Sequence, residues 1–173
     1  MFAKEVYWQR RRMLRAMVGD GLILIAGNEE SPMNYGANTY HFRQNSSFLY
    51  FFGINKPGFY GICDVDNDRD TLYGDDFTID DIIWMGEQPS VSELAAMVGV
   101  GTSSTLSELS NVLKQALKSG RKVHILPHYR GDQIIKLSQI FDLPQREVSK
   151  LVSTELIQAV VKLRAVKDQY EIK

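Results

Sequence analysis

Two acidic residues have the spacing that divalent-metal chemistry uses. Asp64 and Asp66 stand two positions apart at the end of an apolar run, so their carboxylates share one face if that run is a strand. Such a pair can hold a metal ion in two-metal phosphoryl-transfer enzymes. The polar turn sequence over 66–70 explains both acids more simply, because Asp and Asn stabilise turns through bonds between side chain and backbone. We interpret them as turn residues, with a nuclease-type metal site as the alternative.

The histidines are the second candidate for metal chemistry. His124 and His128 are four residues apart, a spacing that on a helix would let both imidazoles bind one metal. Pro127 and the β-branched residues around His124 favour the end of a strand instead, so we do not expect the two rings to converge. His41 stands alone among aromatic and polar residues. We therefore interpret all three histidines as structural.

A glycine-containing segment over 99–104 could place free N–H groups around a phosphate. It lacks the lysine of a P-loop and the third glycine of a dinucleotide fingerprint, and it follows an expected helix instead of a strand. We interpret it as a turn between two helices. The sequence also contains no Gly-x-Ser-x-Gly, Cys-x-x-Cys or His-Glu-x-x-His motif. We therefore predict no catalytic residue and no metal site in this chain.

The elements that would position these residues follow from apolar periodicity and from turn and capping residues. Helices are predicted over 4–18, 90–99, 105–120, 132–141 and 154–163. Strands are predicted over 21–26, 48–54, 59–65, 71–73 and 122–126. The middle three strands would form a meander whose first strand is aromatic, and residues 75–81 would form an acidic loop. Strands separated by helices predict a single domain of the α/β class, with a mixed sheet flanked by helices.

Composition narrows the classes of function. The formal net charge of -1 argues against a nucleic-acid-binding module, and we interpret the basic run Arg10–Arg12 as a solvated helix face. Cys63 is the single cysteine, which excludes an intrachain disulfide and fits a reducing cytoplasm. The sequence has no signal-peptide pattern and no apolar run long enough to cross a bilayer. We expect a cytoplasmic protein that binds neither nucleic acid nor membrane.

One segment is unusual in combining dense aromatic residues with an isolated arginine and amide. Residues Tyr40–Ile54 read YHFRQNSSFLYFFGI. This closely resembles the Tyr-Pro-Phe-Arg-Gln-Asn/Asp-Ser-x-Phe-x-Tyr-x-x-Gly-Phe signature of the N-terminal domain of Xaa-Pro aminopeptidases, in the prolidase/creatinase superfamily. The departures are His41 for proline, Ser47 for an acidic residue and Ile54 for phenylalanine. We call residues 40–54 the aromatic signature.

Three further segments occur in the order that this family would have them. Residues 9–12 are similar to its arginine-rich first helix, and residues 81–86 resemble the Glu-Ile-Trp-x-Gly element that follows the meander. Residues 161–172 resemble the Arg-x-x-Lys-Ser-x-x-Glu-Ile junction that opens the catalytic domain, with Asp168 in place of serine. The resemblance implies a non-catalytic N-terminal domain over residues 1–164. Residues 165–173 would then begin the junction to a C-terminal catalytic domain that lies beyond this chain.

The resemblance also implies a fold, an activity and partners. The fold would be the ribonuclease-H-like α/β fold of the creatinase/aminopeptidase P N-terminal domain. The full-length enzyme would remove the N-terminal residue from peptides that carry proline in second position. Two divalent metals, usually manganese, would be held by the catalytic domain, and no metal ligand carries over onto this chain. The partners of this chain would be its own catalytic domain, the peptide substrate, and further copies in a dimer or tetramer.

Residue roles implied by the resemblance fall in two places. Trp84 would border the substrate site of a neighbouring subunit, with core filling as the alternative. The residues of the aromatic signature would be structural, with direct substrate contact as the alternative for the polar ones; they are Tyr40, Arg43, Gln44, Phe48, Tyr50 and Gly53. We expect Phe48, Tyr50 and Phe52 to alternate onto the core face of a strand, and the guanidinium of Arg43 to be buried against loop carbonyls.

Three alternatives to the aminopeptidase remain open. The chain could be the N-terminal domain of a prolidase or creatinase-like relative, since these enzymes share the architecture. It could belong to a non-enzymatic peptide-binding homologue that has lost its metals. A free-standing ribonuclease-H-like nuclease using Asp64 and Asp66 is the most distant alternative, and it would need further acidic residues converging on the pair.

Overall fold

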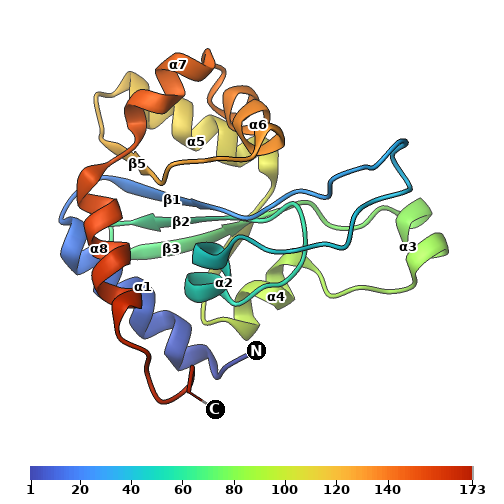
Figure 1. Ribbon diagram of the computed structural model, residues 1–173, viewed down its shortest axis with the longest axis horizontal. Helices are drawn as coiled ribbons and strands as arrows, with labels where there is room; N and C mark the ends of the chain where they lie inside the picture. The colour runs from blue at the N-terminus through green and yellow to red at the C-terminus, as the bar shows by residue number, and fades with distance from the viewer. Residues whose placement is uncertain (173) are drawn as a thin grey trace.

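The computed structural model describes residues 1–172, and its centre is a mixed β-sheet (Figure 1). Within these residues the sheet has five strands, which are β1 (Leu22–Ala26), β2 (Tyr60–Asp64), β3 (Arg69–Tyr73), β4 (Thr102–Ser104) and β5 (Val123–Ile125). Their order across the sheet is β4-β3-β2-β1-β5. β2 is antiparallel to β1 and to β3, whereas β5 runs parallel to β1 and β4 parallel to β3. The carboxyl ends of β1 and β5 therefore lie side by side at the same end of the sheet.

Helices cover both faces of the sheet, as Figure 1 shows. One face carries α1 (Lys4–Val18), α2 (Ser46–Phe52), α4 (Val91–Met97) and α8 (Thr154–Ala165). The other carries α5 (Leu106–Lys118), α6 (Gly131–Phe141), α7 (Gln145–Val148) and the 3₁₀ turn η1 (Ser149–Leu151). Alternate side chains of β1 point to the two faces of the sheet. Ile23 and Ile25 belong to the core on the first face, and Leu22 and Leu24 to the core on the second. This confirms the predicted mixed sheet flanked by helices.

The aromatic segment predicted as a strand over 48–54 is the helix α2, so that prediction is wrong. Phe48, Phe51 and Phe52 are fully buried, and their spacing of three and four residues places them on one face of a helix. Asn45 begins the helix because its side-chain oxygen accepts the first free N–H groups. Gly53 ends it at φ 66°, where a Cβ would also collide with the ring of Tyr7. Caps and packing thus outweigh the β-propensity of the aromatic residues.

Two other segments differ from their predicted form. Residues 99–104 are not a simple turn between helices, because Thr102–Ser104 form the edge strand β4 beside β3. The acidic loop and the apolar segment after it contain a short helix, α3 (Ile79–Met85). Thr78 and Asp81 start α3 with a reciprocal capping box. Among residues 1–172, no helix is both long and apolar enough to cross a membrane.

The arginines of α1 are not the solvated face that the sequence predicted. Arg10 and Arg11 are buried, and only Arg12 of the basic run is exposed. The guanidinium of Arg11 donates to the carbonyl of Phe51 in the last turn of α2 and to the carbonyls of Val98 and Gly99, which directly follow α4. These bonds join α1 to the carboxyl ends of α2 and α4. The guanidinium of Arg10 lies 3.8 Å from the ring centroid of Tyr50, an arrangement that favours a cation.

Candidate functional site

Gln44 is the polar centre of the aromatic signature. Its side-chain oxygen accepts from the backbone N–H groups of Asn28 (2.7 Å) and Asn45 (2.8 Å). Its amide nitrogen donates to the carbonyls of Ile54 (3.1 Å) and Lys56 (2.7 Å). Gln44 is buried and every one of these partners is backbone, so the side chain joins the loop after β1 to both ends of α2.

The other residues of the aromatic signature separate into core and surface. Phe48 is fully buried, Tyr50 is half-buried and donates its hydroxyl to the carbonyl of Leu163 (2.9 Å), and Tyr40 is exposed. Arg43 is also exposed, so the prediction of a buried guanidinium is wrong. The loop is tied instead by Gln44 and by Asn28, whose side-chain amide donates to the carbonyl of Arg43 (2.7 Å).

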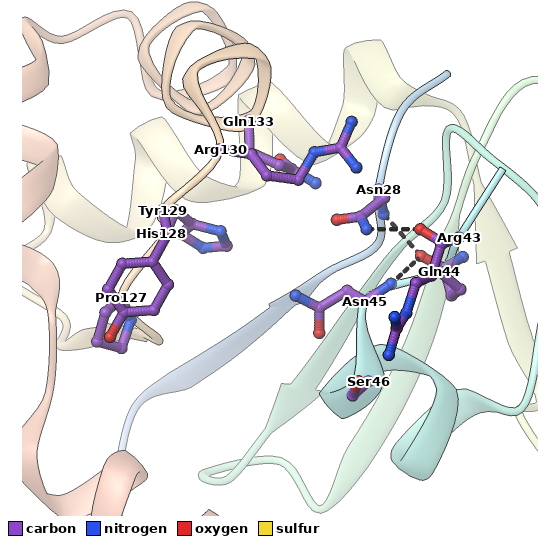
Figure 2. A pocket seen from close by; sticks show the side chains of 10 residues that line it. All are labelled: Asn28, Arg43, Gln44, Asn45, Ser46, Pro127, His128, Tyr129, Arg130 and Gln133. Carbon is purple, nitrogen blue, oxygen red and sulfur yellow. Dashed lines mark hydrogen bonds between the residues drawn. The ribbon is translucent and has the colours of Figure 1, made fainter. Parts of the chain in front are cut away.

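A pocket of about 350 Å³ opens where β1 and β5 end (Figure 2). The carboxyl edge of a parallel strand pair is a common place for ligands in α/β proteins. One wall follows β1 and the aromatic signature, and the other follows β5 and begins α6. The lining residues are Asn28, Arg43, Gln44, Asn45, Ser46, Pro127, His128, Tyr129, Arg130 and Gln133. They include amides and two arginines but no acidic side chain, so the pocket is suited to polar or anionic groups. We call it the β1/β5 pocket.

The α6 wall of this pocket contains a buried amide with one unused atom. Gln133 is 1% exposed, and its nitrogen donates to the carbonyl of Gly27. Its side-chain oxygen Oε1 has no hydrogen-bond partner within residues 1–172. Next to it, Arg130 pairs with Asp132 at 2.7 Å. Burial lowers the pKa of His128 from 6.5 to about 4, which keeps this imidazole neutral at pH 7.

Trp84 lies on α3, away from the β1/β5 pocket. No residue of α3 is buried, and Trp84 is 87% exposed. Figure 1 shows the helix at the end of a long excursion from the sheet. Its other apolar side chains are also open to solvent, namely Ile79, Ile82, Ile83 and Met85. Core filling is therefore wrong for Trp84, and α3 presents an apolar surface of the kind that marks contact sites.

The paired carboxylates at the end of β2 are bound to an arginine. Arg121 donates to both oxygens of Asp64 and, at 2.6 Å, to Asp66. Asn67 adds two bonds to Asp64, and the N–H of Gly21 donates to Asp66 (2.9 Å). An arginine fork occupies the acceptor positions that a metal would use. The interpretation of these acids as turn residues fits this geometry.

The histidines do not converge, as the sequence predicted. His124 in β5 bonds through its ring nitrogens to the hydroxyl of Ser153 (2.7 Å) and the carbonyl of Asp20 (3.1 Å). His128 lines the β1/β5 pocket, and His41 is exposed. Within residues 1–172, no group of three or more His, Cys, Asp or Glu side chains is placed to hold a metal.

The residues of the β1/β5 pocket that sequence reasoning missed are Asn28, Tyr129, Arg130 and Gln133. Each follows or begins an element in an ordinary polar stretch, so its type and spacing carry no chemical signal. A usable signal would have been the parallel pairing of β1 with β5, which brings residues about a hundred positions apart to one edge. That pairing arises in the tertiary structure, and no local pattern in the sequence indicates it.

Fold and site together define a class: an α/β domain with a polar pocket at the carboxyl edge of its parallel strands and a projecting apolar helix. The profile of the family "Aminopeptidase P, N-terminal domain" matches residues 7–126. The chain belongs to this family.

Individual relatives agree with that assignment. The chain is 29% identical to a probable Xaa-Pro aminopeptidase of Talaromyces stipitatus over 90% of its own length and 29% of the relative's. It is 28% identical to the human Xaa-Pro dipeptidase over 71% of its own length and 24% of the relative's. It thus spans less than a third of either relative.

Solved structures show the same fold. Aminopeptidase P from E. coli, in its low-pH form, matches with a TM-score of 0.77 at 21% identity. Proline aminopeptidase P II from Yersinia pestis matches with a TM-score of 0.76 at 18% identity. Each match covers 99% of this chain and 41% of the other. The shared fold extends through α8, beyond the part matched by the family profile.

Proposed function

We propose that this chain is the N-terminal substrate-access and oligomerisation domain of a metal-dependent Xaa-Pro aminopeptidase. The parent enzyme would remove the N-terminal residue from peptides with proline in second position. The observation that carries the proposal is the family match over residues 7–126, within a fold that aminopeptidase P structures share. The names of the fungal relatives support the same activity.

The metals of the proposed parent would lie outside this chain. Two divalent ions, manganese by the family resemblance, would activate water for attack on the peptide carbonyl. The acidic pair of this chain is already neutralised by Arg121, so we assign it no metal. We expect the 173-residue chain alone to leave Xaa-Pro peptides uncut in the presence of manganese. Hydrolysis by the pure chain would contradict this part of the proposal.

The contribution of this chain would come from its surfaces. We propose that α3 contacts a neighbouring subunit in a dimer or tetramer and brings Trp84 to the border of that subunit's peptide site. The exposure of Trp84 and of the isoleucines beside it supports this, because aromatic side chains concentrate in interface cores. A further surface would contact the chain's own catalytic domain.

The test uses the longer parent protein with Trp84→Ala. We expect a raised KM or lowered kcat for Xaa-Pro peptides, a smaller assembly in light scattering, or both. Trp8→Ala is the matched control, because Trp8 is a partly exposed tryptophan on α1 and not on α3. Unchanged kinetics together with an unchanged assembly size in Trp84→Ala would remove α3 from the proposal.

A dipeptidase is the second candidate, favoured by the match to the human Xaa-Pro dipeptidase. The two activities separate on substrate length. An aminopeptidase cuts an Xaa-Pro-Xaa tripeptide, whereas a dipeptidase cuts only the Xaa-Pro dipeptide. A manganese-loaded parent that cuts neither would indicate the non-enzymatic homologue.

The cytoplasm is the compartment that we propose. Cys63 is the only cysteine in the sequence, and it is buried in the core as a free thiol. Burial raises the pKa of this thiol, which keeps it protonated and unreactive. Fractionation of the source cells tests the compartment.

A further inference from the structure

The β1/β5 pocket has an uncompensated cation on one wall. Arg43 is exposed, and its guanidinium makes no ion pair or hydrogen bond within residues 1–172. Its neighbours in the sequence are engaged elsewhere, Gln44 by backbone groups and Asn45 by the cap of α2. The nearby Glu29 accepts a bond from the hydroxyl of Tyr60 (2.6 Å) and does not line the pocket. An anion that enters the pocket therefore finds no acidic side chain in its lining.

Asn45 adds a fixed donor to the same wall. Its side-chain oxygen accepts the N–H groups of Ser47 (2.9 Å) and Phe48 (3.1 Å), which determines the orientation of the amide. The amide nitrogen is consequently directed away from α2, and Figure 2 shows the side chain reaching into the space between the two walls. Arg43 and Asn45 together provide N–H donors suited to a carboxylate.

The opposite wall offers an acceptor instead. The nitrogen of Gln133 must face the carbonyl of Gly27, because its oxygen would meet that carbonyl as a second acceptor. The oxygen Oε1 is therefore fixed as a buried acceptor that no group within residues 1–172 satisfies. Buried polar atoms are nearly always hydrogen-bonded in proteins, so this atom indicates a donor on whatever fills the inner part of the pocket. The dianion of a phosphate monoester has no hydrogen to donate and does not meet that requirement.

We propose that the β1/β5 pocket binds an α-carboxylate whose neighbouring nitrogen carries a hydrogen, the group found in a free amino acid and at the carboxyl terminus of a peptide. The carboxylate would lie against Arg43 and Asn45, and the N–H would satisfy Gln133. A pocket of about 350 Å³ is within the size range of small-ligand sites. This site is separate from α3, and it does not depend on the proposed peptidase activity.

The test is a ¹H–¹⁵N NMR titration of the chain with small probes. N-acetylalanine carries both the carboxylate and an amide N–H, and free alanine carries an ammonium in its place. At pH 8, acetate and methyl phosphate have no hydrogen to donate, and N-acetylalanine methylamide lacks the carboxylate. We expect N-acetylalanine or alanine to shift the signals of Asn28 and Gln133, with affinity roughly tenfold or more above the other three probes. Preference between the first two distinguishes a peptide terminus from a free amino acid.

Two variants assign the binding to named side chains. Asn45→Asp keeps an oxygen that caps α2 but replaces the donor with a negative charge, and Arg43→Gln removes the exposed cation. Each should weaken binding roughly tenfold or more while the chain stays folded. Arg146→Gln is the matched control, because this exposed arginine lies on α7 outside the pocket. The proposal is overturned if no probe shifts the pocket signals, if methyl phosphate binds as well as N-acetylalanine, or if all three variants behave alike.

Discussion

The guanidinium nitrogen Nε of Arg11 donates to a carboxylate oxygen of Asp70 at 2.8 Å, with both side chains enclosed in the protein. Arg15, one helical turn later, pairs with the other oxygen of the same carboxylate. Arg11 and Arg15 thus lie one turn apart on the same face of α1, and together they neutralise the carboxylate of Asp70 on β3. The pair connects the first helix to the sheet, and through the carbonyl bonds of Arg11 to α2 and α4 as well.

Removing Arg11 should destabilise the domain strongly. In Arg11→Met, the carbonyls at the ends of α2 and α4 and one oxygen of Asp70 lose their donor inside the protein. We expect the free energy of unfolding to fall by about 3 kcal/mol or more. Arg12→Met is the control, because Arg12 is exposed and its loss should cost less than about 0.5 kcal/mol. Urea unfolding of both variants measures the difference, and equal losses would contradict the buried role of Arg11.

Gln44→Glu replaces the amide of the aromatic signature with an isosteric carboxylate. The new side chain cannot donate to the carbonyls of Ile54 and Lys56, so both lose a partner. We expect a loss of about 2–3 kcal/mol in the free energy of unfolding. Gln88→Glu makes the same chemical change on the surface, where Lys56 contacts the side chain, and should be neutral or slightly stabilising. Thermal and urea unfolding compare the two, and a neutral Gln44→Glu would refute the role of this amide.

His128 should make the free energy of unfolding depend on pH between about 4 and 6.5. Burial lowers its pKa to about 4, whereas the unfolded chain takes up this proton near 6.5. The unfolded state therefore binds more protons between these values, and the free energy of unfolding falls as the pH drops from 6.5 to 4. His128→Gln should flatten this part of the profile, whereas His41→Gln, at an exposed position, should leave it unchanged. An NMR titration that shows His128 protonated at pH 6 would contradict the prediction.

Arg121 should stabilise the domain at neutral pH, and this stabilisation should fade in acid. Although burial alone raises the pKa of Asp64, the bonds from Arg121 and Asn67 outweigh it and hold this pKa below the ordinary 3.8. The resulting stability is present above pH 3.8 and is lost as the pH falls through the lowered value. Arg121→Gln should therefore reduce stability at pH 7 and weaken its fall below pH 3.8.

The neighbouring pair provides the control for this prediction. Lys122 binds Asp20 at 2.7 Å, but both side chains are largely exposed. Lys122→Gln should leave the pH profile of the free energy of unfolding nearly unchanged, because exposed ion pairs contribute little to stability. A parallel pH series of urea unfolding compares the two variants. If their profiles coincide, Arg121 is an ordinary surface charge and the prediction fails.

Much of the sheet could be predicted because its strands are short, apolar and bounded by turn residues. β1, β2 and β5 lie inside the predicted strands, and α4 and α5 begin directly after Ser90 and Thr105, where helices were predicted to start. The prediction failed where local preference and packing disagree. The aromatic residues of α2 favour strands individually, yet a cap on each side and burial on one helical face select a helix. β4 is three polar residues long, and only the free edge of β3 makes it a strand.

The candidate site was less accessible to sequence reasoning because its contacts are distant along the chain. Gln133 bonds Gly27 across 106 positions, and Arg11 bonds Asp70 across 59. Neither pair has a local pattern, so the arginines of α1 resemble any solvated basic face. Trp84 was different, since the family resemblance already implied an interface role for it, with core filling as the alternative. Its role in a parent enzyme stays a prediction.

Two aromatic truncations separate contact surface from core. Phe51 is fully buried in the core, so Phe51→Ala should lower the free energy of unfolding by about 3–5 kcal/mol through lost burial and a cavity. Trp84 is the larger side chain but is 87% exposed on α3, so Trp84→Ala should change it by less than about 0.5 kcal/mol. Urea unfolding measures both in the same chain. A stable Trp84→Ala with altered assembly in the parent would show that α3 serves contact and not folding, whereas a loss comparable to Phe51→Ala would mean that Trp84 packs inside the domain.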